Sequence, residues 1–128
     1  MAEYVDGYVL PVPKSKVKAY QKMAAEAGKM WMKYGALSYM ECVADDLHSA
    51  AKFGCMPFPK MVKNKSNETI LFSFAIYKSR KHRDAVNKRV HLEMLKVKDQ
   101  YKDMPMPFNP KTMAFGGFKP IVNYQKKK

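Results

Sequence analysis

The sequence predicts an α+β fold built around an antiparallel sheet, and two observations lead to this expectation. Four segments are rich in the branched and aromatic residues that favour strands, at 4–10, 36–44, 69–77 and 113–124. Two longer segments between them repeat their apolar residues every three or four positions, as amphipathic helices do. The chain has 128 residues, 47% of them hydrophobic, so we expect one domain over 1–124 and a short basic tail at 125–128.

The first expected strand, 4–10, carries a carboxylate at its centre and two prolines after its end. We expect Pro11 and Pro13 to end the strand, because proline cannot donate to a sheet ladder. One side of the strand is large and amphipathic, with Tyr4, Asp6, Tyr8 and Leu10, and the other is small and apolar, with Val5, Gly7 and Val9. We therefore expect the small side to pack beneath a helix and Asp6 to point away from the helices.

The next segment, 14–35, is expected to form the first helix. Its apolar residues fall on one stripe, at Val17, Tyr20, Ala24, Ala27, Trp31 and Tyr34. Gly35 fits the end of this helix, because glycine tolerates a positive φ there.

The second strand, 36–44, places another carboxylate, Glu41, on the same side as Leu37, Tyr39 and Val43. The connection that follows is long and contains Gly54, Pro57 and Pro59. A connection of this length is a candidate lid or binding loop, with a short helix near 59–63.

The third strand, 69–77, has a fully apolar side made of Ile70, Phe72, Phe74 and Ile76. Ser79 is the expected N-cap of the second long helix, whose stripe is expected at Ala85 or Val86, at Val90 and at Met94. In the last strand, 113–124, the pair Gly116-Gly117 indicates a bulge or a close approach by another element, and Pro120 favours an edge position.

The resulting β-α-β-β-α-β order is the ferredoxin-like plan, an antiparallel four-stranded sheet with both helices on one face. The uncovered face would carry Tyr4, Tyr8, Leu71 and other apolar groups, more apolar surface than a monomer usually leaves in water. We therefore expect a homodimer that packs sheet against sheet and encloses a cavity.

The charge of the chain is strongly positive, with 24 Lys and Arg against 11 Asp and Glu and a net charge of +13. Nearly all of the basic residues are lysines scattered along the chain, a pattern typical of a solvated surface, so nucleic-acid binding is expected to be absent or non-specific. No segment approaches the roughly 20 apolar residues of a membrane span, and no signal peptide is recognisable, so we expect a cytoplasmic protein without membrane attachment.

No cofactor or metal is expected from the motifs. His48, His82 and His91 are too dispersed for a metal site, and the chain has no Gly-rich phosphate loop. Cys42 and Cys55 form no CxxC motif, and two thiols are too few for a disulfide framework.

Four segments resemble the bacterial YbaA-like family, a domain of unknown function. They are YVDGYVLPVPK, GALSYMECVADD, YKSRKHRDAVN and MPFNPKTMAFGGF. The resemblance covers about Tyr4 to Val122 and implies the dimeric α+β barrel superfamily, whose members include cofactor-independent enzymes and small-molecule binders. This chain departs from the family in its surplus of lysines, in Asn109 where Asp is usual, and in a longer loop near Phe53.

The candidate ligand-binding residues are the polar groups of the strands and of the second helix: Asp6, Tyr8, Tyr39, Glu41, Tyr77, Arg80, Arg83 and Asn87. Asp6 and Glu41 are either an acid/base pair or structural anchors for an arginine. The tyrosines either bind a ligand or form dimer core. Arg83 and Asn87 share a helix face and would hold either an anionic ligand or an internal salt bridge.

These residues lead to one expected function and one alternative. The chain is expected to bind a small molecule, or to act as a cofactor-independent enzyme, in the cavity of the dimer barrel. The alternative is a nucleic-acid or polyanion-binding module that uses the surface lysines. Whether the protein is an enzyme is left open by the sequence.

Overall fold

A computed structural model describes residues 3–103 and 106–126. Its elements, in chain order, are β1 (Tyr4–Pro13), η1 (Lys14–Lys16), α1 (Val17–Lys33), β2 (Ser38–Val43), α2 (Ser49–Lys52), α3 (Phe58–Val62), β3 (Glu68–Tyr77), α4 (Arg80–Tyr101), η2 (Pro110–Thr112) and β4 (Ala114–Phe118). Residues 127–128, the last two of the basic C-terminal residues expected at 125–128, lie outside the described residues.

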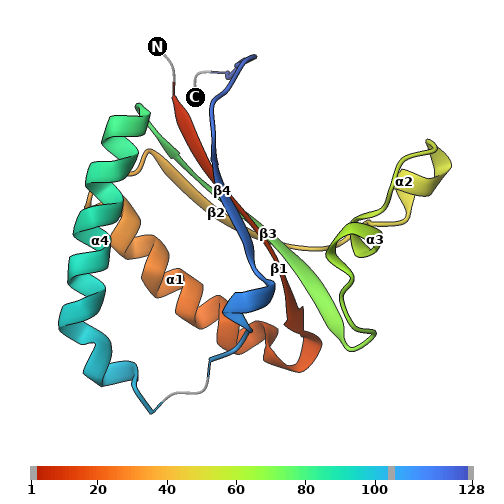
Figure 1. Ribbon diagram of the computed structural model, residues 1–128, viewed down its shortest axis with the longest axis horizontal. Coiled ribbons are helices and arrows are strands. Elements are labelled where there is room, and N and C mark those ends of the chain that lie inside the picture. Colours follow the sequence, from red (N-terminus) through yellow and green to blue (C-terminus); the bar gives the residue numbers. More distant parts are fainter. Residues whose placement is uncertain (1–2, 104–105, 127–128) are drawn as a thin grey trace.

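The four strands form one antiparallel sheet in the order β2-β3-β1-β4. Both long helices, α1 and α4, lie on the same side of this sheet (Figure 1). The expected ferredoxin-like α+β plan is therefore confirmed, and β4 occupies the expected edge position.

Strand β1 continues through both prolines, so the expected end at Leu10 is wrong. Strand β4 pairs only with the part of β1 between Val5 and Val9, whereas β3 pairs with β1 as far as Pro13. Beyond Val9 one side of β1 has no neighbouring strand, and a proline is tolerated on such an edge.

The buried core lies between the helices and one face of the sheet. One cluster contains Tyr4, Ala75 and Tyr77 from the sheet, with Val86 and Val90 from α4. The other packs residues of α1 on the opposite end of the same face; its members are Leu10, Val12, Tyr20, Ala24 and Leu71. We call this side of the sheet the helix face.

The expected orientation of β1 is wrong. Tyr4, Asp6 and Leu10 are buried on the helix face, and Val5 and Val9 lie on the other side. The large side chains fill the space between helix and sheet, and Asp6 is accommodated there because polar groups of α4 bind it. Asp6 and Glu41 lie on the same side of the sheet, as expected, but this side is the one under the helices.

Neither α1 nor α4 covers the other side of the sheet, which we call the open face. The register assigns it Val5, Gly7, Val9, Pro11, Pro13, Ser38, Met40, Cys42, Glu68, Ile70, Phe72, Phe74, Ile76, Ala114, Gly116 and Phe118. Its one charged member is Glu68, at the end of the face beside Pro13, although 27% of the chain is charged. Met40, Phe72 and Phe118 are exposed.

The ends of the helices follow the expected capping residues. Gly35 has a φ of 116° after α1, and the Ser79 hydroxyl accepts a hydrogen bond from the His82 N–H at the start of α4. Val86 and Val90 are buried as expected, but Met94 is exposed, because only the first part of α4 packs on the core cluster.

The connection from β2 to β3, residues 44–67, projects from the sheet on the side opposite α1 and α4, and we call it the arm (Figure 1). Its α3 confirms the expected short helix and lies close to β1. Pro11 and Ile70 are the buried members of the open face, and Ile70 and Pro59 line one small pocket at the base of the arm. The arm therefore rises from one end of the open face.

Strand β4 is shorter than expected and ends at Phe118. A Cβ atom on Gly117 would overlap the Tyr4 hydroxyl and lie 2.7 Å from Arg83 Nη2. The expected close approach at this glycine is confirmed, and residues 119–126 then leave the sheet as a segment that we call the tail.

Among residues 3–103 and 106–126, none of the helices combines the length and the apolar character needed to cross a membrane.

Candidate functional site

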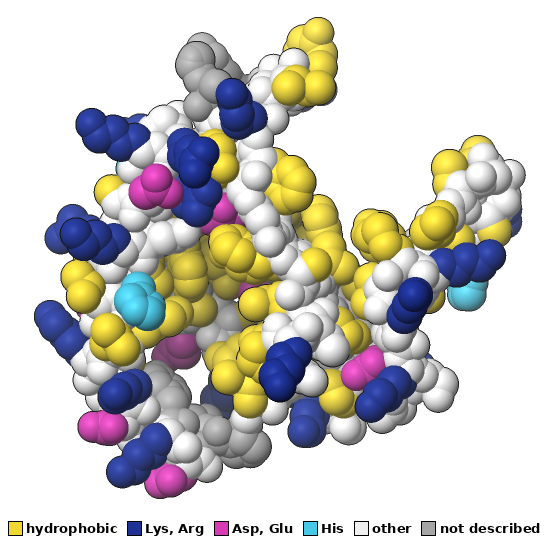
Figure 2. Space-filling model, viewed as in Figure 1, with side chains coloured by type: hydrophobic (Ala, Val, Ile, Leu, Met, Phe, Trp, Pro, Cys, Tyr) yellow, Lys and Arg dark blue, Asp and Glu magenta, His cyan; other side chains and the backbone are white. Residues whose placement is uncertain are grey.

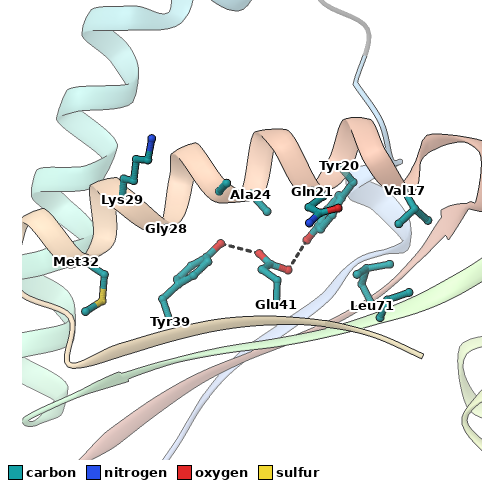
Figure 3. Close-up of a pocket in the computed structure, with 12 residues that line it drawn as sticks. Val17, Tyr20, Gln21, Ala24, Gly28, Lys29, Met32, Tyr39, Glu41 and Leu71 are labelled. Carbon is teal, nitrogen blue, oxygen red and sulfur yellow. Dashed lines mark hydrogen bonds between the residues drawn. The ribbon is translucent and has the colours of Figure 1, made fainter. Parts of the chain in front are cut away.

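A cavity of about 690 Å³ lies between α1 and the sheet, on the helix face (Figure 3). Its lining residues come from α1, β2 and β3: Val17, Tyr20, Gln21, Ala24, Ala25, Gly28, Lys29, Met32, Tyr39, Glu41, Val43 and Leu71. Most of these side chains are apolar, and the volume falls in the usual range for small-molecule sites.

The carboxylate of Glu41 is the polar centre of this cavity. The Tyr20 hydroxyl donates to Oε1 at 2.9 Å, and the Tyr39 hydroxyl donates to Oε2 at 2.6 Å. The two phenols come from different elements, α1 and β2, so they hold the carboxylate from both sides (Figure 3).

Both phenols keep their protons over a wide pH range. Burial raises the pKa of Tyr39 well above its usual value, and its hydrogen bond to Glu41 raises it further. Burial also raises the pKa of Tyr20, followed by the charge of Glu41. The tyrosines are therefore fixed donors, and the remaining lone pairs of Glu41 are the acceptors that a bound molecule would meet.

Gly28 lets α1 approach the sheet at this cavity. A Cβ atom at that position would lie 2.9 Å from Cδ1 of Tyr39, closer than side-chain contacts allow. Neither Gly28 nor the polar role of Tyr20 was predicted as part of the site. A glycine inside an otherwise regular helix was the signal that could have located the contact.

Lys29 is the other charged residue that lines the cavity. Its ammonium group lies 3.2 Å from a carboxylate oxygen of Glu26, and both side chains are largely exposed. Its charge is thus directed to solvent and to Glu26, which leaves Glu41 as the charge within the cavity.

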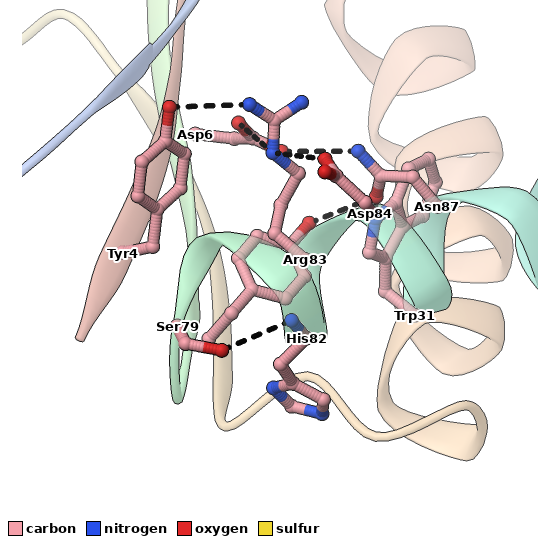
Figure 4. Close-up of polar contacts among 9 residues, drawn as sticks. Tyr4, Asp6, Trp31, Ser79, His82, Arg83, Asp84 and Asn87 are labelled. Atoms are coloured by element: carbon pink, nitrogen blue, oxygen red, sulfur yellow. Dashed lines mark hydrogen bonds and ion pairs between the residues drawn. The ribbon is translucent and has the colours of Figure 1, made fainter. Parts of the chain in front are cut away.

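A second polar cluster surrounds Asp6, which is fully buried (Figure 4). Asn87 Nδ2 donates to Asp6 Oδ2 at 3.2 Å, and Arg83 Nε lies 3.6 Å from Asp6 Oδ1. Trp31 Nε1 and the Tyr77 hydroxyl both donate to Asn87 Oδ1. This network joins β1, β3, α1 and α4.

Arg83 also contacts Tyr4. Its guanidinium lies 4.9 Å from the centre of the Tyr4 ring, and Nη2 donates to the Tyr4 hydroxyl at 3.2 Å. Arg83 and Asn87 do point at one spot, as expected from their spacing, and the anion at that spot is the carboxylate of Asp6.

The predicted site residues thus divide into two groups. Glu41 and Tyr39 line the cavity, whereas Asp6, Tyr77, Arg83 and Asn87 form the buried network. Tyr8 lies between the groups and stacks on Phe115 at 4.8 Å; burial and then the charge of Asp6 raise its pKa. Arg80 is exposed at the start of α4 and joins neither group.

Comparison with known families agrees with this fold. Residues 3–110 match the family described as a protein of unknown function, DUF1428. The chain belongs to this family. Its relative in Escherichia coli strain K12, the uncharacterized protein YbaA, is 36% identical over 121 residues, which cover 94% of this chain and 98% of that protein. The YbaA protein of Shigella flexneri matches to the same extent. The resemblance seen in the sequence is therefore confirmed.

A solved structure of low sequence identity shares the fold. It is described as a dimeric ferredoxin-like protein from an uncultured marine organism, and it matches with a TM-score of 0.61 and 8% identity. The match covers 98% of this chain and all of the other, so the DUF1428 chain has a ferredoxin-like fold over nearly its whole length.

In the part of the chain that the structure describes, no group of three or more His, Cys, Asp or Glu side chains is placed to hold a metal ion.

Proposed function

We propose that the protein binds a small organic molecule in the cavity beneath α1, with Glu41 as the hydrogen-bond acceptor for the ligand. The observation that supports this is a carboxylate fixed by two protonated tyrosines in a mostly apolar cavity. A half-buried charge needs partners, and two phenols leave acceptor capacity on Glu41 for a third. This location differs from the expected one, since the cavity lies within one protomer.

The lining defines the chemistry of the ligand. The walls suit an apolar or aromatic body, and Glu41 suits a hydroxyl or ammonium donor, while an acidic group would meet a like charge. Glu41 could also take a proton from a bound molecule, so the same site would serve a cofactor-independent reaction.

Thermal shift with a matched pair of probes tests this proposal. Phenethylamine should raise the melting temperature, whereas phenylacetate, of similar shape but opposite charge, should not. Glu41→Gln, which keeps one carbonyl acceptor for a tyrosine, should abolish the effect of the amine. Glu26→Gln, an exposed change on the same helix outside the cavity lining, should preserve it. Equal shifts by both probes, or an unaffected Glu41→Gln variant, would contradict the proposal.

We also propose that the protein is a homodimer joined through the open face. The open face exposes Met40, Phe72 and Phe118 and carries its one charged residue, Glu68, at one end, so most of it is the kind of apolar surface that marks an interaction site. A second copy offers the same surface, so a two-fold contact covers both at once. The marine protein of similar fold is described as dimeric, which supports the same assembly.

The distribution of basic side chains supports small-molecule binding over the polyanion alternative. On the side shown in Figure 2, Lys and Arg side chains are spread over α4, the arm and the ends of the sheet and do not form one groove. Polyanion binding by scattered lysines would be weak and would fall steeply with added salt.

A further inference from the structure

We propose that the arm of each protomer packs against the tail of its partner, so that arm and tail complete the dimer interface. This inference rests on the proposed homodimer and concerns how the two copies are oriented. Four observations carry it: the composition of the arm, the composition of the tail, their positions on the open face, and the area of that face.

The arm exposes several large apolar side chains to solvent. Phe53 is 80% exposed, and Met56, Phe58 and Met61 are also exposed. The arm meets its own protomer mainly at its base, where α3 lies close to β1. A projecting segment with several exposed large apolar side chains is a typical contact element between proteins.

The tail has the same character. Ile121 is 95% exposed and Tyr124 is 93% exposed, with Val122 exposed between them. Figure 2 shows hydrophobic side chains along the concave edge that runs from the tail to the arm. The sheet forms the floor of this concavity, with the tail and the arm as its two sides.

Arm and tail stand at opposite ends of the open face. The base of the arm covers Pro11 and Ile70 near the end of β1, whereas the tail leaves β4 at Phe118, which pairs with Val5 near the start of β1. A two-fold axis can therefore set each arm on the partner's tail. The alternative sets arm against arm and would leave the exposed apolar side chains of both tails uncovered.

The open face alone is small for a stable interface. Its strands contain 10, 10, 6 and 5 residues. With a rise of about 3.3 Å per residue and a spacing of about 4.8 Å, the flat area is on the order of 500 Å². A standard interface buries about 800 Å² on each partner. Contacts between arm and tail would supply the remainder.

Cross-linking of the native arm thiol tests the orientation. Cys55 is free and exposed in the arm, and Cys42 is removed by Cys42→Ser because it lies on the open face. With Val122→Cys added, a short bismaleimide should link two chains. Adjacent thiols have a millimolar effective concentration, so at micromolar protein we expect at least about tenfold more covalent dimer than in the controls.

Two controls separate the alternatives. Cys42→Ser alone reports contact between arms, and Cys42→Ser with Leu92→Cys places the second thiol on an exposed position of α4. Light scattering of each variant before the cross-linker is added shows whether the variant is dimeric. A monomer would overturn the homodimer itself, whereas a dimer that fails to link Cys55 to the Val122→Cys thiol, or that links through Cys55 alone, would overturn only the arm-to-tail contact.

Discussion

The two faces of the sheet differ in a way that reverses a common expectation. The helix face, which is covered, holds both mid-strand carboxylates, Asp6 and Glu41, with hydrogen-bonding tyrosines around them. The open face, which neither α1 nor α4 covers, has one charged residue, Glu68, at its end beside Pro13. A carboxylate within a strand therefore does not mark the outer side of a sheet, because a helix that supplies an arginine, an amide or a phenol can accommodate it.

The largest expected effect would come from placing a charge on the open face. Phe72→Lys should raise the dissociation constant of the dimer at least about 100-fold, because an unpaired charge would be buried in an apolar interface. Leu92→Lys is the matched control, since Leu92 on α4 is 49% exposed and Phe72 is 47% exposed. Light scattering over a concentration series measures both. Equal weakening by the two variants would mean that added charge, and not its position on the open face, controls association.

A smaller effect is expected from removing the charge beneath the helices. Asp6→Asn breaks the buried ion pair with Arg83 and should lower the free energy of unfolding by about 1–3 kcal/mol. Asp84→Asn removes an exposed carboxylate 3.4 Å from the same guanidinium and should change the free energy of unfolding by less than about 0.5 kcal/mol. Urea unfolding at one fixed protein concentration compares the two variants with the wild type. Unchanged or increased stability of Asp6→Asn would contradict a stabilising role for the contact between Asp6 and Arg83.

The smallest expected effect is a loss of stability at high pH. Tyr20 and Tyr39 have pKa values raised above the value near 10 of an unfolded tyrosine, so the unfolded chain releases these protons first. Their contribution to stability is complete below pH 10 and is lost as the pH rises above it. The melting temperature should therefore fall above pH 10, and it should fall less steeply in Tyr39→Phe. Tyr124→Phe, at an exposed position, should follow the wild type.

The order of elements could be predicted from the sequence, but the orientation of the strands could not. Local residues determine helix ends, as Gly35 and Ser79 show, and the β-α-β-β-α-β order follows from residue composition and periodicity. Alternation in a strand separates two sets of side chains without saying which set meets the helices. The small set of β1 seemed suited to a helix, yet the structure buries the large one, since partners for Asp6 come from α4, about 80 residues away in sequence.

The candidate site could likewise be predicted only in part, because some of its contacts depend on how helix and sheet pack. Glu41 was predicted as a carboxylate in the middle of a strand, and Tyr39 as a tyrosine on the same side of that strand that could bond a ligand. Tyr20 was expected only as part of an apolar stripe, since its bond to Glu41 depends on how closely α1 crosses β2. That distance is set by Gly28, whose effect becomes visible only when helix and sheet are placed together.

The nearly uncharged open face has a consequence for the kinetics of assembly. Both copies carry the net charge of +13, and the strands of the open face offer only Glu68 as an opposite charge, so two approaching copies repel each other at long range. Screening shortens the range of this repulsion from about 10 Å at 0.1 M salt to about 3 Å at 1 M. Added salt should therefore speed the encounter of two copies and tighten the dimer, whereas it would weaken attachment to any polyanion. The sign of the ionic-strength dependence thus distinguishes self-association from the use of the lysines as a binding surface.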